Sequence, residues 1–203
     1  MRKLQLNAAT LLILILVLVP SCATSDDLSG TGNMKAATPP AQAQTLRKLV
    51  VGDLAPPFAI NTLDGRSYDL KKETEGKVVS IVFWSIFCAP CRRSIPIMND
   101  IYKELRDRQF ELVAVNMDGK KMIEGVKAYV AEEGIVFPVL MDELVDDSLK
   151  VADPYGVQGT PMLFLIDKRG YITFSKAGDL ERDELRAMIL SEMGGSASVS
   201  DKK

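Results

Sequence analysis

The sequence predicts an α/β fold in which helices cover a central sheet of mixed strand direction. Three observations support this prediction. Residues 78–84 form a nearly continuous apolar run rich in β-branched side chains, which is typical of a strand buried on both faces. Segments with helical spacing then alternate with strand-like segments, which favours strands joined by helices. Residues 167–170 form a turn between the last two strand-like segments, which adds an antiparallel pair.

The folded part of the chain begins with a predicted β-hairpin. Residues 58–63 and 66–70 flank Asp64-Gly65, a pair that favours a tight turn with positive φ. The chain has 203 residues, 47% of them hydrophobic and 26% charged, as expected for a soluble domain with a core. We therefore predict one domain at residues 50–193, in which this hairpin is an N-terminal extension.

A helix is predicted after the first buried strand, at residues 88–108, because Ile97, Ile101 and Leu105 share one helical face. The other elements follow from the same two periodicities. They are strands at residues 110–117, 137–140, 162–166 and 171–175, and helices at residues 122–133, 147–152 and 181–193. Their order predicts a sheet that is covered on both faces.

The N-terminus resembles a bacterial lipoprotein signal. Residues 8–19 are apolar, follow the basic Arg2 and Lys3, and are shorter than the ~20 residues that a membrane-spanning helix needs. The run ends in VPSC, which is similar to a lipobox, so we expect removal of residues 1–21 and lipidation of Cys22. An ordinary cleaved signal and an uncleaved anchor are the alternatives.

This signal predicts an extracytoplasmic, membrane-anchored lipoprotein, on the periplasmic side of the inner or the outer membrane. Residues 22–49 then comprise the lipidated cysteine and a flexible linker rich in Ala, Ser, Thr, Gly and Pro. Residues 194–203 have the composition of a disordered tail. Outside the cytoplasm a thiol pair either stays oxidised or is kept reduced by a dedicated electron supply.

The composition excludes several classes of chemistry. Histidine is absent, so the chain cannot form a Ser-His or Cys-His catalytic pair or supply the histidines of most catalytic zinc and copper sites. Three cysteines are too few for a four-thiolate zinc or iron–sulfur site. The formal net charge of −2 gives no sign of affinity for nucleic acid. We expect no metal site, no cofactor and no nucleic-acid partner.

Two of the cysteines, Cys88 and Cys91, lie where the buried strand ends and the first long helix begins. The pair could be a redox couple, half of a metal site or a structural disulfide. The first turn of a helix offers unpaired N–H groups and a positive dipole end, which favour a thiolate at Cys88. Two intervening residues on a helical turn bring Cys91 back beside it, so a disulfide can close and reopen. Arg92 and Arg93 add positive charge nearby, or are solvated surface residues.

Thr160-Pro161 precedes a predicted strand, and X-Pro bonds are the ones for which the cis form is cheap. If this bond is cis and lies beside the disulfide, the backbone of Thr160 is exposed to an extended substrate segment. The residues alone leave the cis and trans forms equally open.

Several motifs, taken in order, resemble the extracytoplasmic thioredoxin-like proteins of the ResA/TlpA type. The matching segments are FWSIFCAPC at residues 83–91, AVNMD at 114–118, FPVLMD at 137–142, YGVQGTP at 155–161 and FLID at 164–167. The resemblance implies a thioredoxin fold, a nucleophile at Cys88, a resolving thiol at Cys91 and a cis-proline at Pro161. We expect Thr160, Pro161 and Trp84 to contact the substrate.

The resemblance also implies partners. Many members of this family are membrane-tethered reductases that keep the haem-binding cysteines of cytochrome c reduced, and a membrane thiol-disulfide carrier supplies their electrons. We therefore expect protein thiols and disulfides as substrates, with apocytochrome c among them, and such a carrier as the electron donor.

The sequence departs from the family pattern at two positions. Ser94 stands where an acidic residue is common, and Phe87 where tryptophan is common. Asp118, at the end of a strand, is either a proton relay or a plain loop carboxylate.

Two rival functions remain. A peroxiredoxin-like thiol peroxidase normally carries a threonine before its cysteine, which the residues before Cys88 lack. A copper-chaperone-like module uses a wider cysteine spacing and a histidine.

Overall fold

The computed structural model describes residues 47–194. The predictions for the signal peptide, Cys22, residues 22–46 of the linker and residues 195–203 lie outside the described residues. Within residues 47–194, none of the helices combines the length and apolar character needed to cross a membrane.

The centre of the domain is a five-stranded mixed sheet, as predicted. Its strand order is β5-β4-β3-β8-β9. Strands β3, β4 and β5 are parallel, whereas β8 is antiparallel to β3 and β9 is antiparallel to β8. The bounds are β3 Val78–Trp84, β4 Phe110–Asn116, β5 Val139–Met141, β8 Met162–Ile166 and β9 Ile172–Ala177.

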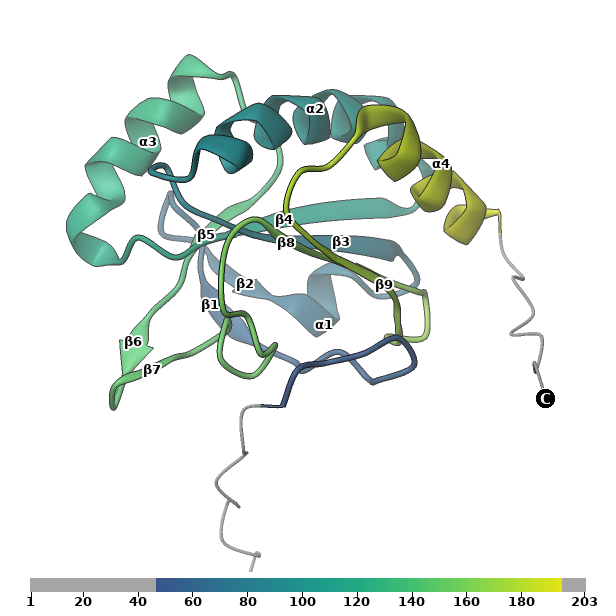
Figure 1. Ribbon diagram of the computed structural model, residues 1–203, viewed down its shortest axis with the longest axis horizontal. Helices are drawn as coiled ribbons and strands as arrows, with labels where there is room; N and C mark the ends of the chain where they lie inside the picture. The colour runs from purple at the N-terminus through teal and green to yellow at the C-terminus, as the bar shows by residue number, and fades with distance from the viewer. Residues whose placement is uncertain (1–46, 195–203) are drawn as a thin grey trace, which may run out of the picture. The chain divides into compact units, whose positions relative to one another are not determined.

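Three helices cover one face of this sheet (Figure 1). Alternate strand residues point to this face, because successive side chains of a strand project to opposite sides. Val78, Val82 and Trp84 of β3 pack there in a core that also contains the buried side chains of the three helices. The helices are α2 (Ala89–Leu105), which continues into the 3-10 helix η1 (Arg106–Arg108), α3 (Ile123–Glu132), which follows the 3-10 helix η2 (Lys120–Met122), and α4 (Arg182–Met193).

The opposite face is covered by the predicted N-terminal hairpin and by irregular chain. The hairpin consists of β1 (Ala59–Asn61) and β2 (Ser67–Asp69), joined through Asp64-Gly65. A single-turn helix, α1 (Leu70–Glu73), follows it and begins where the Asp69 carboxylate accepts two backbone N–H bonds. Val79, Ile81 and Phe83 of β3 pack on this side.

The prediction of a helix at residues 147–152 is wrong. The chain there forms a small hairpin, β6 (Leu144–Val145) with β7 (Ser148–Leu149). Asp146 and Asp147 form its turn with φ of 49° and 62°, a left-handed backbone that aspartate tolerates and a right-handed helix cannot contain. The buried Asp142 carboxylate accepts N–H bonds from Glu143, Val151 and Ala152, which holds both ends of the hairpin.

Candidate active site

The parallel strands β3 and β4 end level with each other, and this positions the site. Trp84 pairs with Asn116 at the end of both strands. The loop of residues 85–87 then leads from β3 directly into α2. Residues 117–118, which follow β4, therefore lie beside this loop.

Cys88 is the N-cap residue of α2 and forms a disulfide with Cys91. The two Cα atoms are 5.2 Å apart. The backbone N–H of Cys91 donates to Cys88 Sγ at 3.2 Å, so the sulfur occupies the place of a capping oxygen. A thiolate at this position faces the unpaired N–H groups and the positive end of α2, which lowers the free energy of the ionised form.

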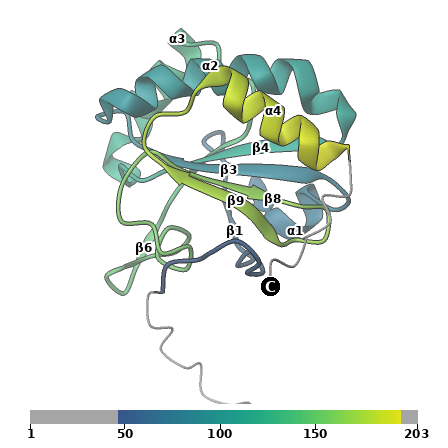
Figure 2. The same ribbon diagram turned by 45° about the vertical axis from the view of Figure 1, so that its right-hand side comes forward.

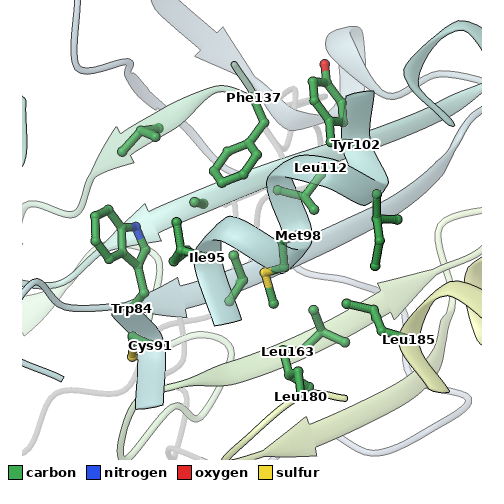
Figure 3. Close-up of a cluster of buried hydrophobic side chains, with 14 of the residues drawn as sticks. Trp84, Cys91, Ile95, Met98, Tyr102, Leu112, Phe137, Leu163, Leu180 and Leu185 are labelled. Atoms are coloured by element: carbon green, nitrogen blue, oxygen red, sulfur yellow. The ribbon is translucent and has the colours of Figure 1, made fainter. Parts of the chain in front are cut away.

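The two sulfurs differ in their access to solvent. Cys88 is partly exposed, whereas Cys91 is 0% exposed. Figure 3 shows Cys91 at the end of the helix-side core where Trp84 lies. The arrangement provides one sulfur that a partner can reach and a second that only the first can reach.

The Thr160-Pro161 bond is cis. It directly precedes β8, and the carbonyl oxygen of Thr160 lies 3.4 Å from Cys88 Sγ. A disulfide sulfur carries no proton, so this is a contact in the oxidised form and a hydrogen bond that the Cys88 thiol can donate. Thr160 is partly exposed and Pro161 is buried. The structure therefore brings together Cys88, Cys91, Thr160 and Pro161, the residues that the sequence indicated.

Trp84 does not share this position. Its side chain is 1% exposed and its ring lies 5.4 Å, centroid to centroid, from that of Tyr129 in α3. The expectation that Trp84 contacts a substrate is wrong for this structure, because the residue reaches no surface. It packs in the core on the helix side of the sheet.

The carboxylate of Asp118 braces that same loop. It accepts hydrogen bonds from the Ser85 hydroxyl at 2.5 Å, from the Ile86 backbone N–H at 2.9 Å and from the Asn116 side-chain amide at 2.8 Å. Asn116 in turn accepts from the Asp118 N–H. Every oxygen of the carboxylate is thus used to hold backbone and side chains in place. Ser85 and Asn116 were not among the predicted site residues, although polar residues at the ends of two adjacent parallel strands are a usable signal.

The surface around Cys88 has an exposed apolar side chain on one side and arginines with their own contact partners on the other. Phe87 is 72% exposed directly before Cys88. Arg92 lies over the Tyr129 ring at 5.8 Å, and Arg93 bonds both carboxylate oxygens of Asp179 at 3.0 Å. These contacts agree with the interpretation of both arginines as surface residues. Ser94, where the family often has an acid, is buried at 2% exposure.

Within the part of the chain that the structure describes, no cluster of three or more His, Cys, Asp or Glu side chains is placed to hold a metal ion. The arrangement of a partly exposed cysteine, a buried cysteine and an adjacent cis-proline suits thiol-disulfide exchange, in which the two cysteines are the reacting groups of the protein.

Comparison with known proteins agrees with this chemistry. Residues 51–175 match the AhpC/TSA family. Among curated proteins, the thiol-disulfide oxidoreductases ResA of Bacillus thuringiensis (strain Al Hakam) and of Geobacillus thermodenitrificans are each 32% identical to the chain. Each alignment covers 70% of this chain and 78% of the relative.

A solved structure from Chlorobium tepidum, titled as a candidate thiol:disulfide interchange protein DsbE, is 34% identical with a TM-score of 0.63. It is matched over 72% of this chain and 100% of its own. The thioredoxin domain of a thiol-disulfide oxidoreductase from Bacteroides vulgatus is 27% identical over 71% of this chain and 98% of its own, with a TM-score of 0.60. The chain therefore belongs to the AhpC/TSA family, and it is a thiol-disulfide oxidoreductase of the ResA type with a thioredoxin fold.

Proposed function

We propose that the protein is a membrane-tethered, extracytoplasmic protein-disulfide reductase that acts through Cys88 and Cys91. The observation that carries this proposal is the unequal burial of the two sulfurs at the N-terminus of α2, beside the Thr160 carbonyl. Cys22 supplies the tether by lipidation, and the chain acts outside the cytoplasm.

The first step uses the reduced protein. The Cys88 thiolate attacks one sulfur of a partner disulfide, so the partner's S–S bond breaks and a Cys88–partner disulfide forms. The partner's second sulfur leaves as a thiolate and takes a proton from solvent. Phe87 and the Thr160 backbone flank Cys88 and offer the partner an apolar contact and a hydrogen-bonding edge.

The second step releases the partner. Cys91, having lost its proton, attacks Cys88 Sγ, which is one helical turn away, and the Cys88–Cys91 disulfide re-forms. The partner's remaining sulfur leaves as a thiolate. Two electrons have then passed from the protein to the partner, and a membrane thiol-disulfide carrier returns them by reducing the Cys88–Cys91 bond. Apocytochrome c, with its haem-binding cysteine pair, is the proposed substrate.

The reduction potential of the Cys88–Cys91 couple tests the direction of this exchange. It is measured by equilibrating the protein with glutathione or thioredoxin of known poise and quantifying the oxidised fraction. A potential near that of thioredoxin, about −270 mV, agrees with a reductase. A potential near about −120 mV, as in a strong oxidant, would overturn the proposed direction.

A further inference from the structure

Apolar side chains gather on the surface at the point where the described chain begins. Val50, Val51, Leu54 and Tyr171 are 53%, 61%, 61% and 42% exposed. They lie together because residues 50–54 run along the start of β9. Leu54 forms an antiparallel β-bridge with Tyr171. The Gly52 N–H donates to the Ile172 carbonyl at 2.8 Å, and the Ile172 N–H donates to the Asp53 carbonyl at 2.9 Å. We call these four residues, together with the cavity described next, the entry face.

The cavity beside these residues has a volume of about 400 Å³. Leu54 and Gly170 are part of its lining, so it is continuous with the apolar surface. Its floor is apolar, and its rim carries four basic side chains and two acidic ones: Lys71, Lys77, Lys168 and Arg169 with Glu75 and Asp167.

The rim keeps an excess of positive charge. Asp167 pairs with Arg169 at 2.7 Å, and Lys77 pairs with Glu111 at 3.2 Å. Lys168 bonds the neutral amide oxygen of Gln109, and neither Lys71 nor the acidic Glu75 forms an ion pair among residues 47–194, so one net positive charge remains on the rim. The Arg169 guanidinium also lies 5.6 Å from the centre of the Tyr171 ring, next to the exposed apolar group. Exposed cations beside an aromatic and aliphatic surface are the combination found at membrane interfaces.

The entry face lies where the proposed tether meets the domain. The described chain starts at Arg47, and residues 23–46 alone separate it from Cys22. In Figures 1 and 2 the N-terminal segment, in dark blue, lies on the opposite side of the sheet from α2 and α4. A domain resting on this face keeps α2, with Cys88 at its start, turned away from the surface beneath.

We propose that the entry face docks on the surface of an anionic phospholipid bilayer, an inference that rests on the membrane tether of the proposed function. Val50, Val51 and Leu54 enter the interfacial layer, Tyr171 lies at the level of the headgroups, and Lys71 and Lys168 bind phosphate groups. Docking orients the disulfide toward partners that arrive from the aqueous side.

Depth-dependent fluorescence quenching of the full chain, anchored in vesicles with brominated acyl chains, tests this orientation. The single native tryptophan, Trp84, is buried and serves as an internal reference. A Leu54→Trp reporter probes the entry face, and a Val136→Trp reporter probes the connection between α3 and β5, on the helix side. In vesicles of phosphatidylcholine and phosphatidylglycerol, we expect quenching at position 54 and none at position 136.

The charge dependence is tested in the same vesicles. Lys71→Gln with Lys168→Gln should lower the ratio of docked to undocked protein about thirtyfold, since each basic residue near an anionic surface contributes about 1 kcal/mol. Lys103→Gln with Lys121→Gln, at exposed lysines away from the entry face, is the matched control and should leave the ratio unchanged. Vesicles of phosphatidylcholine alone should give weak quenching.

Several outcomes would overturn the proposal. Equal quenching at positions 54 and 136, or equal quenching in neutral and anionic vesicles, excludes oriented electrostatic docking. The tryptophan at position 54 could instead become less accessible to acrylamide quenching as the protein concentration rises, without quenching by lipid. That result would assign the face to a second copy of the chain. Vesicle flotation and insulin-disulfide reduction, measured on the same samples, separate a failure of docking from a failure of the tether. A protein that floats with the vesicles and reduces insulin, but whose reporter is not quenched by lipid, contradicts only the docking. A chain that does not float contradicts the tether and the docking together.

Discussion

The two sulfur atoms of the site differ because α2 begins between them. Cys88 precedes the helix and stays partly exposed, whereas Cys91 lies inside the first turn and is buried against β3. Their positions could be predicted from the sequence, since a buried strand followed by CxxC and helical spacing determines which cysteine caps the helix. The burial of Trp84 could not, because it depends on Tyr129, which belongs to a helix far along the chain.

Replacement of each cysteine should give a different result. Cys88→Ser removes the attacking sulfur, so reduction of insulin disulfides should fall to the uncatalysed rate. Cys91→Ser keeps the attack but removes the resolving thiol, so a covalent adduct with the partner should accumulate. Non-reducing electrophoresis and mass spectrometry measure both. Turnover by the Cys88→Ser protein would show that the assigned nucleophile is incorrect.

Asp118 is predicted to act as a positioning residue rather than as a proton relay. Asp118→Asn turns one acceptor atom into a donor toward Ser85 or Ile86, so it should lower the free energy of unfolding by about 1–3 kcal/mol. Ser85→Ala removes one of the same bonds and should cost about 1 kcal/mol. Urea unfolding of the oxidised proteins measures both values.

A control and a kinetic readout separate the two roles of Asp118. Asp146→Asn makes the same chemical change in the exposed β6–β7 turn and should be nearly neutral. If Asp118 only positions the loop, Asp118→Asn should lower the rate of disulfide exchange by the same factor at every pH. Loss of an inflection that the parent's pH–rate profile shows would instead support a proton relay.

At the scale of elements, short-range patterns predicted most of the secondary structure. The continuous apolar run of β3 and the Asp64-Gly65 turn each favour one local structure. The observed bounds of β3 agree with the prediction, and the hairpin forms with shorter strands than predicted. The prediction for residues 147–152 was wrong because a carboxylate outside this segment holds the hairpin. Asp142 binds the backbone on both sides of it, a contact that no periodicity within the segment reveals.

The loop that leads to Pro161 depends on a glycine that the chain start approaches closely. Gly156 has φ of +65°, and a Cβ built there would lie 2.8 Å from the Arg47 carbonyl oxygen. Gly156→Ala should therefore combine backbone strain with a clash and lower the free energy of unfolding by more than about 2 kcal/mol.

Gly65→Ala is the matched control for that substitution. Gly65 has φ of +84° but no atom within 4 Å of the built Cβ, so only the backbone cost of about 1–2 kcal/mol applies. Thermal or urea unfolding compares the two variants. An equal loss in both would show that the contact with Arg47 does not constrain the loop.

For the whole molecule, the fold class could be predicted from the order of the elements, but the elements that cover the second face of the sheet could not. The sequence predicts two covered faces without saying what covers them. Helices α2, α3 and α4 lie on one face, and the hairpin, α1 and the irregular chain around Tyr155 cover the other. That division depends on long-range packing, which periodicity alone does not determine.

The absence of histidine shapes the pH dependence of the whole domain. No imidazole titrates, so the stability of the oxidised protein should be constant between about pH 6 and pH 8. Burial, together with the neighbouring Glu111 carboxylate that accepts its hydrogen bond, raises the pKa of Tyr102 to about 12. The folded-state pKa lies above the ordinary value of 10, so the stabilisation is present below pH 10 and is lost as the pH rises toward 12.

Tyr102→Phe should make the alkaline decline in stability shallower. Unfolding is followed by circular dichroism while phenolate absorbance reports tyrosine ionisation. Tyr171→Phe, which removes an exposed hydroxyl, is the control. An alkaline decline that is identical in the parent and in Tyr102→Phe would contradict the assignment.

The central claim is that Cys88 is the reachable, ionised sulfur, and alkylation of the reduced protein tests it most directly. Substoichiometric iodoacetamide is added at neutral pH, and peptide mass spectrometry locates the label. The account predicts that Cys88 is labelled first and that Cys91, 0% exposed in the oxidised structure, is labelled only after denaturation. Initial labelling of Cys91 with Cys88 protected would contradict it.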